Sequence, residues 1–146
     1  HGEKVGVGLV LASKIYHKAA ERMLEGDFQV KDSMPVETDL IQENFNKPGM
    51  YEIIMEENTP NLLDEVDSAK LIEYKEEIAS IIREIPTAEE LIAMIDQVEG
   101  VKSLKDLGFD ESYQAKTANL SPYVRARITF MRLLKFYDFY EEVISC

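Results

Sequence analysis

The stretch HGEKVGVGLVLASKIYHKAAERMLEG, residues 1–26, decides the fold class, because its apolar residues recur at three- and four-residue spacing. This spacing predicts a helix over residues 2–24, and Gly26 is expected to end it. The residues expected near the buried face are Val5, Leu9, Ala12, Tyr16, Ala20 and Met23. Gly6 and Gly8 each cost roughly 1 kcal/mol relative to Ala in a helix, so the sequence predicts a crowded helix start.

The rest of the chain carries the same helical period and no run of alternating β-branched residues, which predicts an all-α fold. Thr87 with Glu90 three residues later has capping-box spacing and is the clearest helix start in the chain. Pro86 is expected to end the helix before it. The further helices are expected at residues 35–45, 51–57, 68–85, 88–100, 110–118 and 121–136. Residues 1–146 are thus expected to form a single helical domain.

Composition excludes several classes of protein. Acidic residues outnumber basic ones 28 to 16, and a net charge of -12 repels nucleic acid. The single cysteine, Cys146, excludes an internal disulfide and a cysteine-zinc cluster, and favours a reducing compartment. No apolar stretch approaches the ~20 residues of a membrane span, and no basic region precedes an apolar signal core. We expect a soluble, cytoplasmic protein with neither a nucleic-acid nor a membrane partner.

His1 is the candidate metal ligand, because neutral imidazole binds zinc, iron and nickel. The alternative is that His1 is only a chain end or the remnant of a tag. His17 lies roughly 24 Å further along the helix, so it cannot share a metal with His1, and we interpret it as a surface histidine. The paired acidic residues at 56–57, 76–77, 89–90 and 141–142 are interpreted as solvated surface rather than as an acid and its base.

No glycine-rich cofactor loop, P-loop or activated nucleophile is present in a recognised setting. Arg125, Arg127 and Arg132 fall on the expected last helix. Their guanidinium groups can bind a phosphate or a carboxylate, and partnering carboxylates within the domain is an equal alternative.

Two segments at opposite ends of the chain resemble one family. HGEKVGVG, residues 1–8, resembles the segment of iron-containing alcohol dehydrogenases and glycerol dehydrogenases that carries their last metal-ligand histidine. It is most similar to the sn-glycerol-1-phosphate dehydrogenase branch. ANLSPYVRARITFMRL, residues 118–133, resembles the final helix of that branch, with its paired arginines, and IPTAEEL, residues 85–91, is similar to a proline-led helix between them.

The resemblance implies the metal-side, C-terminal helical domain of the glycerol dehydrogenase and dehydroquinate synthase-like fold. It implies that His1 is the second of two histidines that hold a divalent metal with one Asp: zinc first, with iron or nickel as alternatives. The implied reaction is hydride transfer between dihydroxyacetone phosphate and NAD(P)H, so the substrate is a small phosphorylated polyol. The Asp, the first His and the nucleotide-binding domain would lie upstream, and the chain alone is expected to be inactive.

The chain starts without Met inside a helical pattern, which we interpret as a piece of a larger protein. The rival hypothesis is a freestanding acidic helical module that binds a basic partner without catalysis. Self-association as a homo-oligomer through apolar surface left bare by a missing domain is a third expectation.

Overall fold

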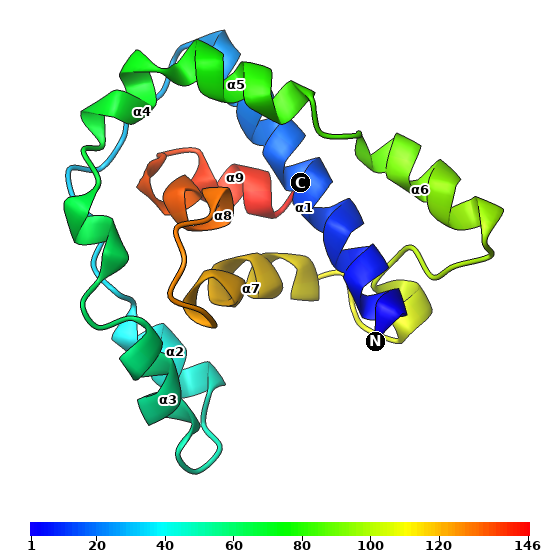
Figure 1. Cartoon of the computed structure of the whole chain (residues 1–146), viewed down its shortest axis with the longest axis horizontal. Coiled ribbons are helices and arrows are strands. Elements are labelled where there is room, and N and C mark those ends of the chain that lie inside the picture. Colours follow the sequence, from blue (N-terminus) through cyan, green and yellow to red (C-terminus); the bar gives the residue numbers. More distant parts are fainter.

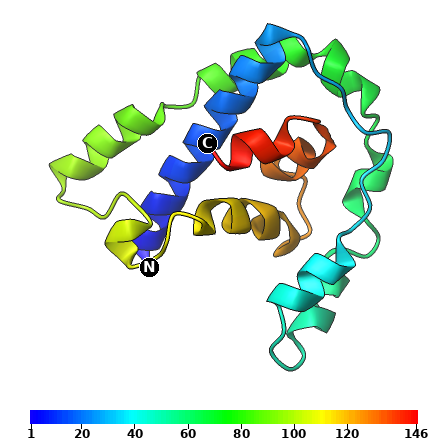
Figure 2. The ribbon, with the colours of Figure 1, turned by 180° about the vertical axis from the view of Figure 1, so that it is seen from behind.

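Helix α1 (Gly2–Glu25) is the longest element of the computed structural model, which describes all residues from His1 to Cys146. The chain is all-α, with nine α-helices and four 3-10 helices, and its only strand-like feature is an isolated antiparallel bridge between Val30 and Tyr137. Figures 1 and 2, seen from opposite sides, show that the other elements surround α1 and leave α2 and α3 at one end of the molecule. The predicted all-α class is therefore confirmed.

The remaining elements, in chain order, are α2 (Thr38–Asn44), α3 (Met50–Glu57), η1 (Leu62–Glu65), α4 (Ala69–Glu73), α5 (Lys75–Arg83), α6 (Ala88–Gln97), η2 (Lys105–Leu107), α7 (Tyr113–Leu120), η3 (Ser121–Tyr123), α8 (Phe130–Leu133), η4 (Leu134–Phe136) and α9 (Tyr140–Ile144). Helix α1 packs mainly against α5 and α6 on one side and α9 on the other. None of the helices combines the length and the apolar character that crossing a bilayer requires.

The apolar interior is divided into two clusters of unequal size. The main core contains 19 buried residues, including Met23 of α1, Ile82 of α5 and Val143 of α9. A smaller cluster joins Ile41 of α2, Ile54 of α3 and Tyr123 of η3. Helices α2 and α3 therefore have a core of their own, and something other than the main core must hold them to the body.

The predicted face of the first helix was wrong in its first turns. Val5 and Leu9 are 56% and 51% exposed, and Val7 and Val10 are buried in their place. The cause is packing from the α6 side, where the carbonyl of Val101 approaches α1: a Cβ on Gly6 would lie 3.6 Å from it. The prediction is right further along, since Ala20 and Met23 are buried.

The expected crowding is found at neither of the two early glycines, since even a Cβ on Gly6 would make only ordinary van der Waals contacts, 3.6 Å from the Val101 carbonyl and 3.7 Å from Ile95. Gly6 faces Val101, whereas a Cβ on Gly8 would meet no atom within 4 Å. The predicted helix end is confirmed, because Gly26 adopts the left-handed conformation, with φ at 82°, that closes α1.

Two long helices expected from the sequence are broken in the structure. The one expected over residues 68–85 is divided at Tyr74, which lets α4 turn away while α5 follows α1 (Figure 1). The one expected over residues 121–136 is a short turn of η3, an irregular segment and then α8, whose start is capped by Thr129. Tertiary contacts of the residues on either side, described below, explain this second break.

The capping-box prediction at Thr87 is confirmed. Its hydroxyl accepts a hydrogen bond from the Glu90 N–H at 3.2 Å, and the Glu90 carboxylate accepts one from the Thr87 N–H at 2.7 Å. Helix α6 ends at Gln97, three residues before the expected Gly100.

Candidate functional site

His1 lies exposed at the start of α1, and its side chain makes no capping hydrogen bond. No group of three or more His, Cys, Asp or Glu side chains in the structure is arranged to hold a metal ion. A catalytic zinc site usually takes about three protein ligands. In this structure no other candidate metal ligands are gathered with His1 into such a group.

The structure also places His17 and the four acidic pairs, the other candidate polar groups of the sequence. His17 is half-buried, and its Nε2 lies 2.9 Å from the carbonyl oxygen of Ile85, so it joins α1 to the segment after α5. It is not the free surface histidine that we expected. The eight residues of the acidic pairs are exposed except Glu57, which is half-buried and contacts a distant loop.

The most unusual chemistry of the interior is a polar network around Arg132 and Lys135, which are 0% and 1% exposed. Arg132 Nη2 donates to Asn58 Oδ1 at 2.7 Å, and Lys135 Nζ donates to Glu37 Oε2 at 2.6 Å. Both cations also lie over the ring of Tyr123, at 5.6 Å and 5.0 Å from its centroid. Two buried cations thus lie against one aromatic ring, and only Lys135 has a carboxylate partner.

The network connects the main body to the α2–α3 end of the molecule. Glu37 and Asn58 flank the α2–α3 pair, while Arg132 and Lys135 belong to α8 and η4. The Tyr123 hydroxyl donates to Glu37 Oε2 at 2.6 Å, and Asn58 Nδ2 donates to the Tyr123 carbonyl at 2.8 Å. These bonds hold the smaller apolar cluster in place. They also explain why the chain leaves the helical path after Tyr123, since Tyr123 and Arg132 must both reach Asn58.

Burial shifts the pKa of the groups in this network. Desolvation lowers the pKa of Lys135, and the hydrogen bond to Glu37 opposes this shift. Desolvation raises the pKa of Tyr123 and of Tyr140 well above the ordinary tyrosine value. Perturbed groups of this kind often mark active sites, but these are enclosed and already paired with one another. We therefore assign the network to the architecture of the domain.

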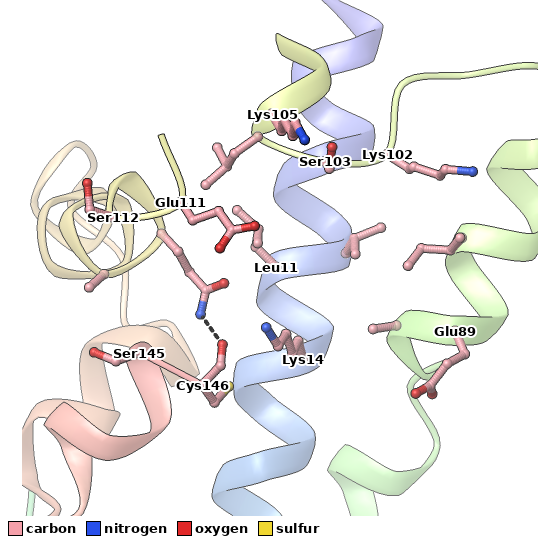
Figure 3. A pocket seen from close by; sticks show the side chains of 16 residues that line it. Leu11, Lys14, Glu89, Lys102, Ser103, Lys105, Glu111, Ser112, Ser145 and Cys146 are labelled. Atoms are coloured by element: carbon pink, nitrogen blue, oxygen red, sulfur yellow. Dashed lines mark hydrogen bonds between the residues drawn. The ribbon is translucent and has the colours of Figure 1, made fainter. Parts of the chain in front are cut away.

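A groove of about 830 Å³ lies between α1, α6, the segment around η2, α7 and the C-terminal residues (Figure 3). Its apolar wall includes Val10, Leu11 and Ile92, and its charged residues are Lys14, Glu89, Lys102, Lys105 and Glu111. This volume is typical of small-molecule sites. The α1 wall begins at Val10, about 13 Å along the helix from His1 at 1.5 Å per residue.

The groove is lined by side chains of both charges, three lysines and two glutamates. In Figure 3, Glu111 and Lys14 point into the space between α1 and α7, and Lys102 is paired with Asp96. Burial raises the pKa of the Cys146 thiol, the opposite of the lowered pKa that activates a cysteine nucleophile. Gln114 donates to the Cys146 carbonyl at 2.9 Å and holds the chain end against the wall. The groove is thus a cavity of mixed apolar and charged lining whose one thiol is not activated.

The three arginines that the sequence placed on one helix are separated. Arg132 is buried and partners an amide and the carbonyl of Pro122, not a carboxylate. Arg125 and Arg127 are exposed in the irregular segment between η3 and α8. Neither of these two guanidinium groups has a carboxylate within salt-bridge distance. The expectation that such residues partner carboxylates within the domain is not met at any of the three.

Comparison of the chain with protein-family models, curated proteins and solved structures found no match.

Sequence reasoning missed the buried network and the groove. The pairing of Arg132 with Asn58 spans 74 positions, and that of Lys135 with Glu37 spans 98. The available signal was local: basic residues spaced three apart within the apolar run FMRLLKFY, residues 130–137. Charged residues inside such a run are expected to be buried and paired, although their partners cannot be read from the run itself.

Proposed function

We propose that the chain is the helical, metal-side domain of a glycerol-1-phosphate dehydrogenase-like enzyme, with His1 as a ligand of its divalent metal. The observation that supports this proposal is the position of His1. It is exposed at the start of the longest helix, next to exposed Val5 and Leu9 on the following turns. A ligand histidine beside bare apolar surface is what a domain facing a second domain across a cleft would present.

The residues present fit one ligand of the metal and no part of the nucleotide. A single exposed imidazole suits zinc, iron or nickel, and the proposal assigns the other ligands, an Asp and a second His, to an upstream nucleotide-binding domain. When bound, such a metal supplies Lewis-acid polarisation of a carbonyl oxygen. No motif in this chain fits NAD(P), so we derive no step through that cofactor.

The contribution of this chain would be to position His1 and to keep water from the cleft. Helix α1 is fixed along its length by contacts with α5, α6 and α9, and Met23 and Ala19 are fully buried. A ligand on such a rigid element keeps its geometry better than one on a loop. Val5 and Leu9 would pack against the second domain and exclude solvent on the same side as His1.

The test uses the polypeptide from its native source that contains this sequence. We would measure its bound metal by elemental analysis, and its oxidation of NADH and NADPH with dihydroxyacetone phosphate. Replacing the residue at position 1, His1→Ala, is expected to abolish both metal retention and activity. Lys4→Ala removes another exposed side chain from the same turn and is expected to preserve both.

Equal metal content in the two variants would overturn the assignment of His1. Absence of metal and of activity in the native polypeptide, together with specific binding of a basic protein, would favour the interaction module instead. Size-exclusion chromatography of the same preparation would test the expected homo-oligomer.

A further inference from the structure

The segment between η3 and α8, residues 124–129, forms a tight turn centred on Ala126. The Arg127 N–H donates to the Arg125 carbonyl at 2.8 Å, which closes a three-residue turn. The N–H of the central residue, Ala126, donates outside the segment to Glu57 Oε2 at 2.7 Å. An anionic oxygen is thus already bound at the apex of this turn.

The two residues on either side of Ala126 in the sequence are both cationic, and neither has a carboxylate partner. Arg125 and Arg127 are exposed, and no carboxylate lies within 4.0 Å of either guanidinium. Arg22, in comparison, contacts the two carboxylates of Glu25 and Glu142 at 2.6 and 2.9 Å. Arg125 Nη1 makes one long hydrogen bond, to the Val124 carbonyl at 3.4 Å. In a chain of net charge -12, two arginines without carboxylate partners on either side of one donated N–H are a local concentration of positive charge.

The carboxylate that binds the Ala126 N–H belongs to Glu57, which lies at an electrostatically unfavourable end of α3. Glu57 is the last residue of α3, and a negative charge at a helix C-terminus is destabilised by the helix dipole. The hydrogen bond from the Ala126 N–H offsets that cost. The bond involves only one oxygen of a singly charged carboxylate, and neither arginine side chain takes part in it. A ligand with more charge and more acceptor oxygens would satisfy the turn better than Glu57 does.

We propose that residues 125–127 form a binding site for a small phosphate monoester, in which Glu57 occupies the anion position until phosphate displaces it. Phosphate carries nearly two negative charges at neutral pH and has three acceptor oxygens. It can therefore accept from the Ala126 N–H and, once the exposed side chains of Arg125 and Arg127 turn toward it, from both guanidinium groups. A polyanionic nucleic acid is disfavoured by the acidic surface around the turn. This inference does not depend on the dehydrogenase proposal, because it follows from the turn alone.

The experiment is a titration of the full chain with inorganic phosphate, and then with glycerol phosphate, followed by the amide resonance of Ala126. The resonance is expected to shift and to saturate. Arg125→Ala and Arg127→Ala are each expected to weaken binding about tenfold, which is typical for loss of one charge-assisted contact. Glu57→Gln is expected to strengthen binding several-fold, because it removes the competing charge while keeping the shape.

Arg83→Ala is the matched control, since it removes the same charge from an exposed position on α5 that has no carboxylate partner. It is expected to leave the affinity unchanged within about twofold, as screening of distant exposed charges predicts. An Ala126 resonance that does not respond to phosphate would overturn the proposal. So would weaker binding in Glu57→Gln, or an equal loss in Arg83→Ala. Metal retention by His1 is measured separately, so either proposal can fail without the other.

Discussion

Asn58 is the residue on which the attachment of α2 and α3 to the body most depends, and Asn58→Ala tests that role. Its side chain is 2% exposed and makes three hydrogen bonds. Nδ2 donates to the carbonyls of Ile54 and Tyr123 at 2.7 and 2.8 Å, and Oδ1 accepts from Arg132 at 2.7 Å. Truncation leaves both carbonyls and a buried guanidinium N–H without these partners.

The expected loss in the free energy of unfolding is about 4 kcal/mol. The unpartnered N–H of the buried cation accounts for about 2 kcal/mol, and each carbonyl accounts for about 1 kcal/mol. The loss exceeds the usual effect of a point mutation because the abandoned group is charged and enclosed. Arg132 Nε already has no hydrogen-bond partner, which leaves the guanidinium little capacity to rearrange.

Urea unfolding followed by circular dichroism measures this loss directly. Asn44→Ala is the matched control, since Asn44 Nδ2 also donates to a carbonyl four residues earlier, Leu40 at 2.8 Å, but has no cationic partner. It is expected to cost about 1 kcal/mol. In an Arg132→Met background the cost of Asn58→Ala is expected to fall to about 2 kcal/mol. Two results would refute this explanation. One is a loss in the free energy of unfolding below about 1 kcal/mol for Asn58→Ala alone, and the other is a loss of about 4 kcal/mol for Asn58→Ala in the Arg132→Met background.

Two further predictions concern alkaline pH and the early glycines. Burial raises the pKa of Tyr16, Tyr123, Tyr137 and Tyr140, so the stability that they contribute is fully present below about pH 10 and is lost above it, at up to about 1.4 kcal/mol per pH unit for each. The pKa of Lys135 is lowered, so its contribution to stability rises with pH instead, and this rise is complete at about pH 10. Tyrosinate absorbance recorded beside circular dichroism checks this, and ionisation of any of the four while the helices persist would contradict it. Gly8→Ala is expected to raise the free energy of unfolding by about 0.5–1 kcal/mol, because the new Cβ meets no atom within 4 Å, and an unchanged or lower urea midpoint would show that this position is constrained by something else.

Local signals predicted the parts of the fold that local energies determine. The capping box at Thr87 and the left-handed glycine at position 26 were both read correctly, since each is settled by a few neighbouring atoms. The buried face of α1 was predicted only in part. Periodicity shows that a helix has an apolar face, but it cannot specify which elements pack on that helix, and Val7 and Val10 are buried where Val5 and Leu9 were expected.

The candidate site shows the same contrast between features that local sequence determines and features that tertiary packing determines. His1 could be selected from the sequence as a candidate metal ligand because histidine is the commonest metal ligand among the side chains, and this assignment stays a prediction. The position of the groove beside α1 could not, since its walls come from α1, α6, α7 and the chain end, which are far apart in sequence. The buried network was equally inaccessible, because each of its pairs joins residues from distant elements.

The different positions of the three arginines show how one buried hydrogen bond, from Arg132 to Asn58, affects the conformation of the residues before it. A continuous helix over residues 121–136 would have placed Arg125 and Arg132 on one face and Arg127 on the opposite face. Arg132 instead turns inward to Asn58, and Thr129 caps a new helix start so that it can do so. The residues before Thr129 are thereby released from helical geometry, and only then can the Ala126 N–H, which would have pointed along a helix, donate to a carboxylate from α3. The buried arginine fixes the architecture, and the two exposed arginines gain a turn that can bind an anion.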